Sequence, residues 1–420
     1  MRASKWSKVE ASLAVQGSRD MSSMIAVPAA IGRRRMLQGA AGLGLTGLGG
    51  CVTVAGKVSA LASPPPVLAP IRASMERVFD ITVCTRPFRA QGPRLDTETI
   101  GDALIVHNYG HGGSGWSLSW GSSSIAVQKA MAGSPREIAV VGCGALGMTS
   151  AILAQRAGAK VTIYARDLFP QVRSARATGS WTPDSRIALT NEAGPAFGAL
   201  WEQMARTSWK TYRDYLGLPG DPVVFNDRYA LRSSRPRAPA PPGSLDFAEY
   251  SQTYAPEARE VSTPLPPGST PFDWPNVSRS SSLMFNLRSY GHLLMTDFLA
   301  AGGRFVRTEF HEPGDLAGLP QKVVINCPGY AARQWWKDRS VTPVRGQIGW
   351  LIPQPEVTYG LQYAGVSILP RTDGIVVQVL TGGDMKGYGD DTEIPDRAET
   401  EGGVAIIADL FANRFRARGG

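Results

Sequence analysis

Residues 138–165 read IAVVGCGALGMTSAILAQRAGAKVTIYA, and this stretch decides the fold class. Ile138 to Val141 is a short apolar run typical of a buried strand, and Lys160 to Ala165 is a second one. The small residues between them predict a helix that ends near Ala157. A strand, a tight turn, a helix and a second strand form a βαβ unit, which indicates an α/β protein.

The turn of this unit has the G-x-G-x-x-G spacing of a dinucleotide site. Gly142 allows the tight turn, Gly144 lets backbone approach a diphosphate, and Gly147 lets the helix pack close to the strand. Ala145 and Leu146 open the helix, whose N-terminal N–H groups and dipole attract negative charge. We therefore expect these five residues to bind a dinucleotide.

The end of the second strand leaves the choice between NAD and FAD open. Ala165 stands where an acidic residue is usual, and Arg166 and Asp167 follow it. Asp167 is expected to reach the ribose, and Arg166 to lie over the adenine or near the phosphates.

A second glycine-rich segment favours FAD. Residues 107–121 read HNYGHGGSGWSLSWG, in which four glycines fall within six residues and His and aromatic residues flank them. Glycine backbone can lie flat against a planar ring. The serines at 122–124 predict a helix start at about residue 122, whose dipole would stabilise negative charge on that ring.

The remaining chain alternates helices and strands. We expect helices at about 122–132, 196–216, 290–302 and 403–417, and strands near 79–85, 304–308, 322–326, 346–352 and 374–380. The Pro, Ser and Gly content predicts exposed loops at 233–244 and 263–271.

Several motifs resemble those of the FAD-dependent D-amino-acid oxidase family. They are Arg86-Pro87-Phe88-Arg89, Ala165-Arg166-Asp167, the stretch from Ala177 to Pro183, Asn326-Cys327-Pro328-Gly329, Arg345-Gly346-Gln347 and the glycine segment itself. The resemblance covers most of residues 76–400. It implies a Rossmann-like FAD-binding domain (100–190 and 286–336) and a mixed-sheet substrate domain (76–99, 191–285 and 337–420).

The resemblance also assigns site residues. Arg86 would hold the substrate carboxylate through two parallel hydrogen bonds, the Gly113 carbonyl would hold the amine, and Tyr363 would be a lid residue. Ser367 stands where the family has a second tyrosine. The FAD ligands would include Gly112, Gly113, Ser114, Gly115 and Ser117 from the glycine segment and Thr178, Gly179, Ser180 and Trp181 from the later loop.

The order of the motifs differs from that of the family. There the arginine strand and the glycine segment follow the G-x-G-x-x-G strand, whereas here both precede it. We interpret this as a circular permutation, with the new ends between the helix at 403–417 and the strand at 79–85. Exposed loops and neighbouring termini make such a rearrangement tolerable.

The first 75 residues resemble an export leader. Residues 1–50 hold seven basic and two acidic residues, whereas the rest of the chain holds 37 basic and 33 acidic ones, so the net charge of +9 gives no nucleic-acid-binding stripe. Arg33-Arg34-Arg35-Met36-Leu37 fits the twin-arginine export signal, and the apolar run that follows is too short to span a membrane. We expect a signal at 1–50 and a Pro-rich tether at 51–75.

Cys51 at the end of that run resembles a lipidated residue, which would anchor the protein in the periplasm; cleavage after Ala62 is the alternative. Cys84, Cys143 and Cys327 then remain, an odd number that favours buried thiols over disulfides. No His, Cys or Asp cluster has metal-ligand spacing.

The function implied by the resemblance is oxidative deamination of D-amino acids. Hydride transfer to flavin N5 would give a 2-oxo acid and ammonia, and molecular oxygen would give hydrogen peroxide. A dehydrogenase that passes electrons to the respiratory chain is one alternative, and a non-catalytic binding lipoprotein is another. No proton-transfer role is assigned to His107 or His111.

Overall fold

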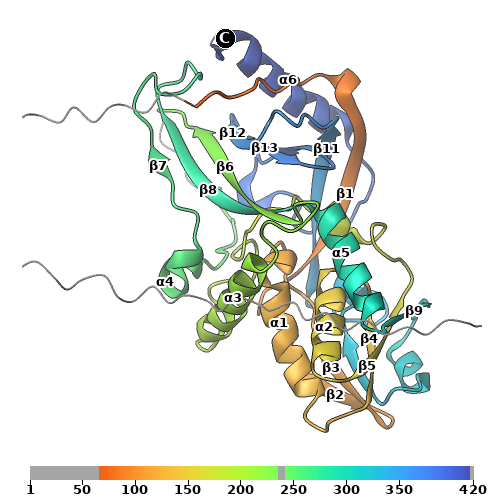
Figure 1. The fold of residues 1–420 in the computed structure, drawn as a ribbon. Coiled ribbons are helices and arrows are strands. Elements are labelled where there is room, and N and C mark those ends of the chain that lie inside the picture. Colours follow the sequence, from red (N-terminus) through yellow and green to blue (C-terminus); the bar gives the residue numbers. More distant parts are fainter. Residues whose placement is uncertain (1–65, 235–241, 417–420) are drawn as a thin grey trace, which may run out of the picture. The chain divides into compact units, whose positions relative to one another are not determined.

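Two sheets, one of six strands and one of eight, organise the chain in the computed structural model (Figure 1), which describes residues 66–234 and 242–416. The six-stranded sheet has the order β2-β3-β10-β4-β5-β9. All neighbours pair in parallel except β2 with β3. Its strands are β2 (Thr97–Ile100), β3 (Ala103–His107), β4 (Glu137–Val141), β5 (Lys160–Ala165), β9 (Arg304–Arg307) and β10 (Val323–Asn326).

The helices of this half pack against the sheet or against one another. They are α1 (Gly115–Ala130), α2 (Ala145–Arg156), α3 (Phe197–Arg213) and α5 (Leu287–Ala300). A shared apolar core, with Val140 and Ile163 from the strands and Met148 from α2, holds them in place. The predicted βαβ unit is therefore present as β4-α2-β5, and the α/β class is confirmed.

The eight-stranded sheet is mixed and has the order β1-β11-β14-β13-β12-β6-β8-β7. Its strands are β1 (Val78–Arg89), β6 (Val223–Leu231), β7 (Thr263–Pro264), β8 (Val277–Phe285), β11 (Val341–Leu351), β12 (Tyr359–Tyr363), β13 (Val366–Arg371) and β14 (Gly374–Val379). Only the β12–β6 pair is parallel. Helix α6 (Arg397–Asn413) buries Val404, Ile407 and Leu410 against this sheet.

Short helical turns complete the described structure. They are α4 (Ser251–Tyr254), η1 (Met75–Arg77), η2 (Arg173–Arg176), η3 (Pro256–Ala258), η4 (Pro313–Gly318), η5 (Gly329–Arg333) and η6 (Gly383–Met385). Of these, η2, η5 and η6 reach the site described below.

Helix α1 begins at Gly115, seven residues before the start predicted from the serines. The serines lie inside the helix because its neighbours satisfy their hydroxyl groups: Ser122 Oγ donates to Asn108 Oδ1 at 2.5 Å, and Ser123 Oγ shares a hydrogen bond of 2.8 Å with Thr149 Oγ1. Because α1 begins at Gly115, the positive end of its dipole lies at the glycine segment itself.

Two boundaries differ from the predicted domains and tether. β2 covers Thr97–Ile100, which the sequence interpretation placed mainly in the substrate domain, yet β2 belongs to the six-stranded sheet. The folded core also begins before residue 75, because Ile71 is buried beside α6 and the Tyr359 hydroxyl donates to the Ala69 carbonyl at 2.7 Å. The Rossmann-type and mixed-sheet parts form one compact unit.

The predicted export signal, Cys51 and the alternative cleavage site after Ala62 lie outside the described residues. Within residues 66–234 and 242–416, no helix is both long and apolar enough to cross a membrane.

Candidate active site

A cavity of about 1390 Å³ lies where the carboxyl ends of β4, β5 and β10 meet one face of the eight-stranded sheet. Pockets for small ligands usually measure about 300–1,000 Å³, so this cavity has room for a large cofactor together with a substrate. The cavity lies outside the carboxyl ends of parallel strands, beside β4, where the order of strands in the sheet changes direction along the sequence. This position is typical of nucleotide sites in α/β proteins.

The G-x-G-x-x-G turn forms one wall of the cavity. Gly142 has a φ of +93°, and a Cβ there would lie 2.4 Å from the carbonyl oxygen of Cys327. A Cβ on Gly147 would lie 2.0 Å from the Gly142 carbonyl oxygen, so Gly147 stands behind the wall as a packing residue and does not line the cavity. Gly142, Gly144, Ala145 and Leu146 do line it, with the N-terminus of α2 at this point.

The glycine segment forms a second wall. Gly112 has a φ of +54°, and a Cβ there would lie 1.9 Å from the Arg186 carbonyl oxygen. The Gly113 N–H donates to the Ser185 carbonyl at 2.9 Å, and Gly112, Gly113 and Gly115 line the cavity. This close contact with the segment at residues 185–186 explains why the glycine segment needs glycine.

Ser114 and Ser117, predicted as FAD ligands, lie behind this wall and support it. Ser114 Oγ donates to the Ser185 carbonyl at 3.1 Å, and Ser117 Oγ accepts a hydrogen bond of 2.8 Å from the Thr182 N–H. Both serines are buried and neither lines the cavity.

The loop after η2 forms a third wall. Thr178, Gly179 and Ser180 line the cavity as the sequence predicts. Trp181 does not: it is buried, and its indole N–H donates to the Ala258 carbonyl at 2.8 Å. Its contact with Trp209, at a ring distance of 5.1 Å, makes it a support for the loop.

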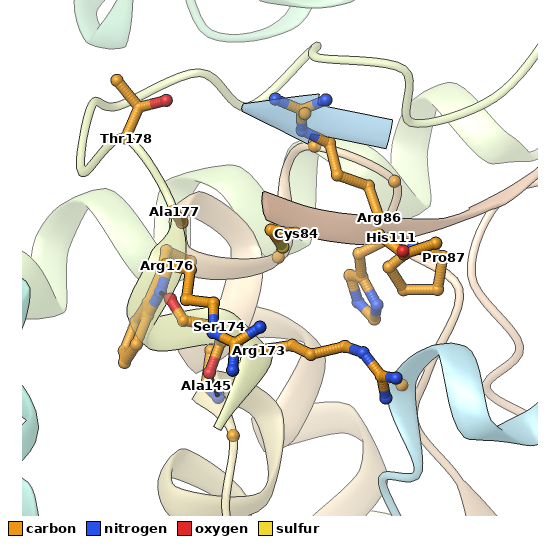
Figure 2. Close-up of a pocket in the computed structure, with 18 of the residues that line it drawn as sticks. Cys84, Arg86, Pro87, His111, Ala145, Arg173, Ser174, Arg176, Ala177 and Thr178 are labelled. Atoms are coloured by element: carbon orange, nitrogen blue, oxygen red, sulfur yellow. Dashed lines mark hydrogen bonds between the residues drawn. The ribbon is translucent and has the colours of Figure 1, made fainter. Parts of the chain in front are cut away.

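Arg173, Ser174 and Arg176 on η2 also line the cavity, and the sequence analysis missed them. Ser174 Oγ accepts a hydrogen bond of 3.1 Å from the Ala145 N–H, which places η2 directly over the N-terminus of α2. Figure 2 shows these residues on one side of the cavity and Arg86 on another, with Cys84 between them. Basic residues directly before a cofactor-binding loop are the signal that was available in the sequence.

Arg166 and Asp167 line the cavity at the end of β5 and bind each other, with Arg166 Nη2 2.8 Å from Asp167 Oδ2. Hydrogen bonding to Asp167 raises the pKa of Arg166. The structure brings both residues to the dinucleotide turn, and the carboxylate of Asp167 is already paired.

Arg86 points into the cavity from β1. Its Nη1–H donates to the Arg345 carbonyl at 3.2 Å, and it has no carboxylate partner within 4.0 Å in the described part of the chain. The guanidinium lies over Gly346, where a Cβ would be 2.2 Å away, which explains the glycine of the Arg345-Gly346-Gln347 motif. Burial lowers the pKa of Arg86, while the nearby Cys84 and Asp384 raise it. A buried cation with free donors suits a carboxylate ligand.

The floor of the cavity is a polar row across the eight-stranded sheet. Gln362 on β12 pairs with Ser367 on β13, which pairs with Gln378 on β14, and all three line the cavity. Tyr363 lines it at the end of β12, with its ring 5.1 Å from that of Trp274. The two glutamines were not predicted, because single polar residues in a strand carry no motif.

The two histidines of the glycine segment are buried, and His111 also lines the cavity. His107 Nε2 lies 2.6 Å from Glu98 Oε1, and His107 Nδ1 lies 3.2 Å from Asn326 Nδ2. His111 Nε2 lies 2.7 Å from Ser122 Oγ. Burial, assisted by Arg89, lowers the pKa of His111 to about 3, so its ring is neutral at ordinary pH.

The three described cysteines are free thiols, and burial raises the pKa of each. No group of three metal-binding side chains occurs within residues 66–234 and 242–416.

The cavity fits FAD in shape and in charge. Seven arginines and three acidic residues line it, and this excess of positive charge suits a diphosphate and a carboxylate together. Backbone of two glycine turns faces it, as a planar ring and a diphosphate require.

Comparison with known proteins agrees with this geometry. The family model for the FAD-dependent oxidoreductases (DAO) matches residues 137–418. The chain belongs to this family. Members bind FAD, so FAD is the cofactor of the cavity.

The individual relatives share modest sequence identity with this chain. The chain is 28% identical to the D-amino-acid oxidase of Streptomyces coelicolor over 249 residues, covering 56% of this chain and 69% of that protein. It is 30% identical to the D-amino-acid oxidase of Rubrobacter xylanophilus over 214 residues, covering 50% of this chain and 57% of that protein. Among solved structures, the L-amino acid deaminase of Proteus vulgaris matches with a TM-score of 0.42 and 12% identity, covering 66% of this chain and 80% of that one.

Proposed function

We propose that this member of the FAD-dependent oxidoreductase family oxidises D-amino acids to 2-oxo acids and ammonia, with molecular oxygen as electron acceptor and hydrogen peroxide as product. The observation that carries the proposal is the position of Arg86. It faces the cavity from β1 without a carboxylate partner in the described residues, and it lies beside the glycine segment. The two D-amino-acid oxidases among the relatives support the choice of substrate.

Arg86 would fix the plane and the charge of the substrate carboxylate. The Gly113 carbonyl would accept a hydrogen bond from the substrate amine, and Tyr363 would cover the side of the site over the sheet. When bound, FAD supplies the acceptor for a hydride from the α-carbon. The amine must lose its extra proton before oxidation, and the resulting imino acid is hydrolysed by water.

Two titratable side chains of the cavity, His111 and Cys84, carry no charge at ordinary pH. His111 does not gain a proton at ordinary pH, and the Cys84 thiol stays protonated because burial raises its pKa. We therefore assign no protein side chain as general base, and the chain contributes orientation and charge.

The proposal is tested by incubating the purified FAD-loaded protein with matched D- and L-amino acids, and measuring 2-oxo acid, ammonia and peroxide. We expect equal amounts of all three from D-amino acids only. Turnover that requires an artificial electron acceptor and yields no peroxide would instead identify a dehydrogenase. Reaction with L-amino acids alone would overturn the proposed stereochemistry, and absence of any flavin reduction would indicate a non-catalytic protein.

A further inference from the structure

A second hollow of about 350 Å³ adjoins the main cavity. Four residues line both spaces and form the shared wall between them: Thr182, Ser185, Arg186 and Asp384. Behind the shared wall, the hollow offers apolar surface from Trp181, Phe247 and Ala248. Phe247 also lies edge-on to Phe88, with ring centres 5.4 Å apart.

Arg186 is the bulk of the shared wall. Its Nε donates to the Asp384 carbonyl at 2.7 Å, and its Nη2 donates to the Gly383 carbonyl at 3.1 Å. The carboxylate of Asp384 is 3.5 Å from Nη2 and is mostly exposed, whereas the Arg186 side chain is only 12% exposed. Arg186, the largest of the four side chains, is therefore held in the shared wall by its own hydrogen bonds.

The backbone of Arg186 is in an unusual conformation. Its φ is +50°, a region that non-glycine residues seldom adopt, so the surrounding structure holds it there. Its carbonyl oxygen lies so close to Gly112 that a Cβ there would be 1.9 Å away. The position of the shared wall is thus coupled to the glycine segment.

The shared wall adjoins the end of the cavity where Arg86 lies. The Ser185 carbonyl accepts the Gly113 N–H at 2.9 Å. Burial, assisted by the charge of Arg86, lowers the pKa of Arg186 to about 10, and the nearby Asp384 opposes the lowering of the pKa of both arginines. A substrate held by Arg86 and Gly113 would therefore have its α-carbon next to the shared wall, and its side chain would meet either the wall or the polar row of the sheet.

We infer that Arg186 is a specificity-determining residue that closes the hollow to the substrate side chain. This inference rests on the proposed function. With the wall in place, a substrate side chain cannot enter the hollow and shares the main cavity with the cofactor, so the protein selects D-amino acids with short side chains. The apolar surface that an aromatic side chain needs lies behind Arg186.

The test compares kcat/KM for D-phenylalanine with kcat/KM for D-alanine in the wild type and in three variants. Arg186→Ala removes the bulk of the wall, Arg186→Gln removes the charge and keeps most of the length, and Arg259→Ala changes a residue that lines only the hollow. We expect the ratio to rise at least about 10-fold in Arg186→Ala. It should change little in Arg186→Gln and in Arg259→Ala.

A binding measurement accompanies the kinetics, with flavin absorbance as the signal. Acetate and 3-phenylpropionate carry the carboxylate and cannot be oxidised as amino acids, and only the second needs the hollow. A lower dissociation constant for 3-phenylpropionate, but not for acetate, in Arg186→Ala supports the inference. This holds even if no amino acid is a substrate, in which case only the proposed function fails. Equal effects on both ligands and an unchanged kinetic ratio, with FAD retained, would overturn the inference.

Discussion

Arginines of this chain show how far single residues can be interpreted from sequence. Arg86 was predicted as the carboxylate ligand from its motif, and it faces the cavity with free donors. Arg173, Arg176 and Arg186 line the same cavity but come from loops and a short turn. Their positions depend on contacts with Glu393 and with the carbonyls of Gly383 and Asp384, which are more than 190 residues away in sequence. The local sequence therefore shows basic residues near a cofactor-binding loop but does not show that they face the cavity.

His111 provides a prediction at this scale. Its pKa is about 3 in the folded protein, against about 6.5 in an unfolded chain, so between these values only the unfolded chain takes up the proton. Stability due to this residue is complete above pH 6.5 and is lost as the pH falls. The advantage of the wild type over His111→Asn in unfolding free energy should shrink by about 2–3 kcal/mol between pH 7.5 and 4.5.

Urea unfolding at the two pH values, with FAD at fixed excess, measures this difference. His292→Asn is the matched control, because His292 is exposed on α5. An advantage over His111→Asn that is the same at both pH values would show that folding does not lower the pKa of His111.

At the scale of elements, apolar patterns predicted the βαβ unit, but several strands were missed, among them the apolar β3 and the serine-rich β8. The βαβ unit and the helices α3, α5 and α6 agree with the predicted ranges to within about six residues. β8 was missed because Val277–Phe285 is rich in serine, which is typical of loops. In the structure Ser278, Ser280 and Ser282 are buried beside β6, and only Ser281 is exposed. Tertiary pairing has overridden local propensity there.

The dinucleotide turn yields a prediction for this scale. Gly142 and Gly158 have φ of +93° and +96°, but a Cβ would meet the Cys327 carbonyl only at Gly142, since nothing lies within 4 Å at Gly158. Gly142→Ala should weaken FAD binding at least about 10-fold, because a shift of the turn removes hydrogen bonds to the diphosphate. Gly158→Ala should cost about 1–2 kcal/mol of stability and leave FAD binding unchanged.

Equilibrium titration with FAD, followed by flavin fluorescence, compares the two variants. If both variants lost the same FAD affinity, backbone strain would explain the loss, and the contact between a Cβ at residue 142 and the Cys327 carbonyl would not.

For the whole molecule, the order of the segments is the unusual feature. The family match begins at residue 137, although β1 and the glycine segment before it line the same cavity as the matched region. The first described residues and the end of α6 pack in one apolar cluster, with Leu68 and Ile71 on one side and Phe411 and Phe415 on the other. These facts support our proposal that the chain is a circular permutation of its family. The order of the motifs in the sequence predicted a circular permutation. The fold adds that both ends of the described structure lie in one apolar cluster.

A reverse permutation tests this proposal. The new ends would lie in the exposed turn at residues 132–136 between α1 and β4, and a flexible linker would join residue 416 to residue 66. Because the contacts of the core stay the same, we expect the rearranged protein to fold and to bind FAD with affinity within about 10-fold of the original. Circular dichroism and FAD titration measure both properties, and an unfolded product would count against a permuted origin.

The central claim is that Arg86 holds the carboxylate of an amino acid beside FAD in one cavity. The most direct measurement is the anaerobic loss of flavin absorbance on mixing with a D-amino acid, in the wild type, in Arg86→Ala and in the control Arg397→Ala, which changes an exposed arginine on α6. Loss of a charged hydrogen-bonded contact, worth about 1.5–3 kcal/mol, predicts an apparent substrate dissociation constant about 10- to 150-fold higher in Arg86→Ala only. Equal reduction of all three proteins at the same substrate concentration would contradict the account.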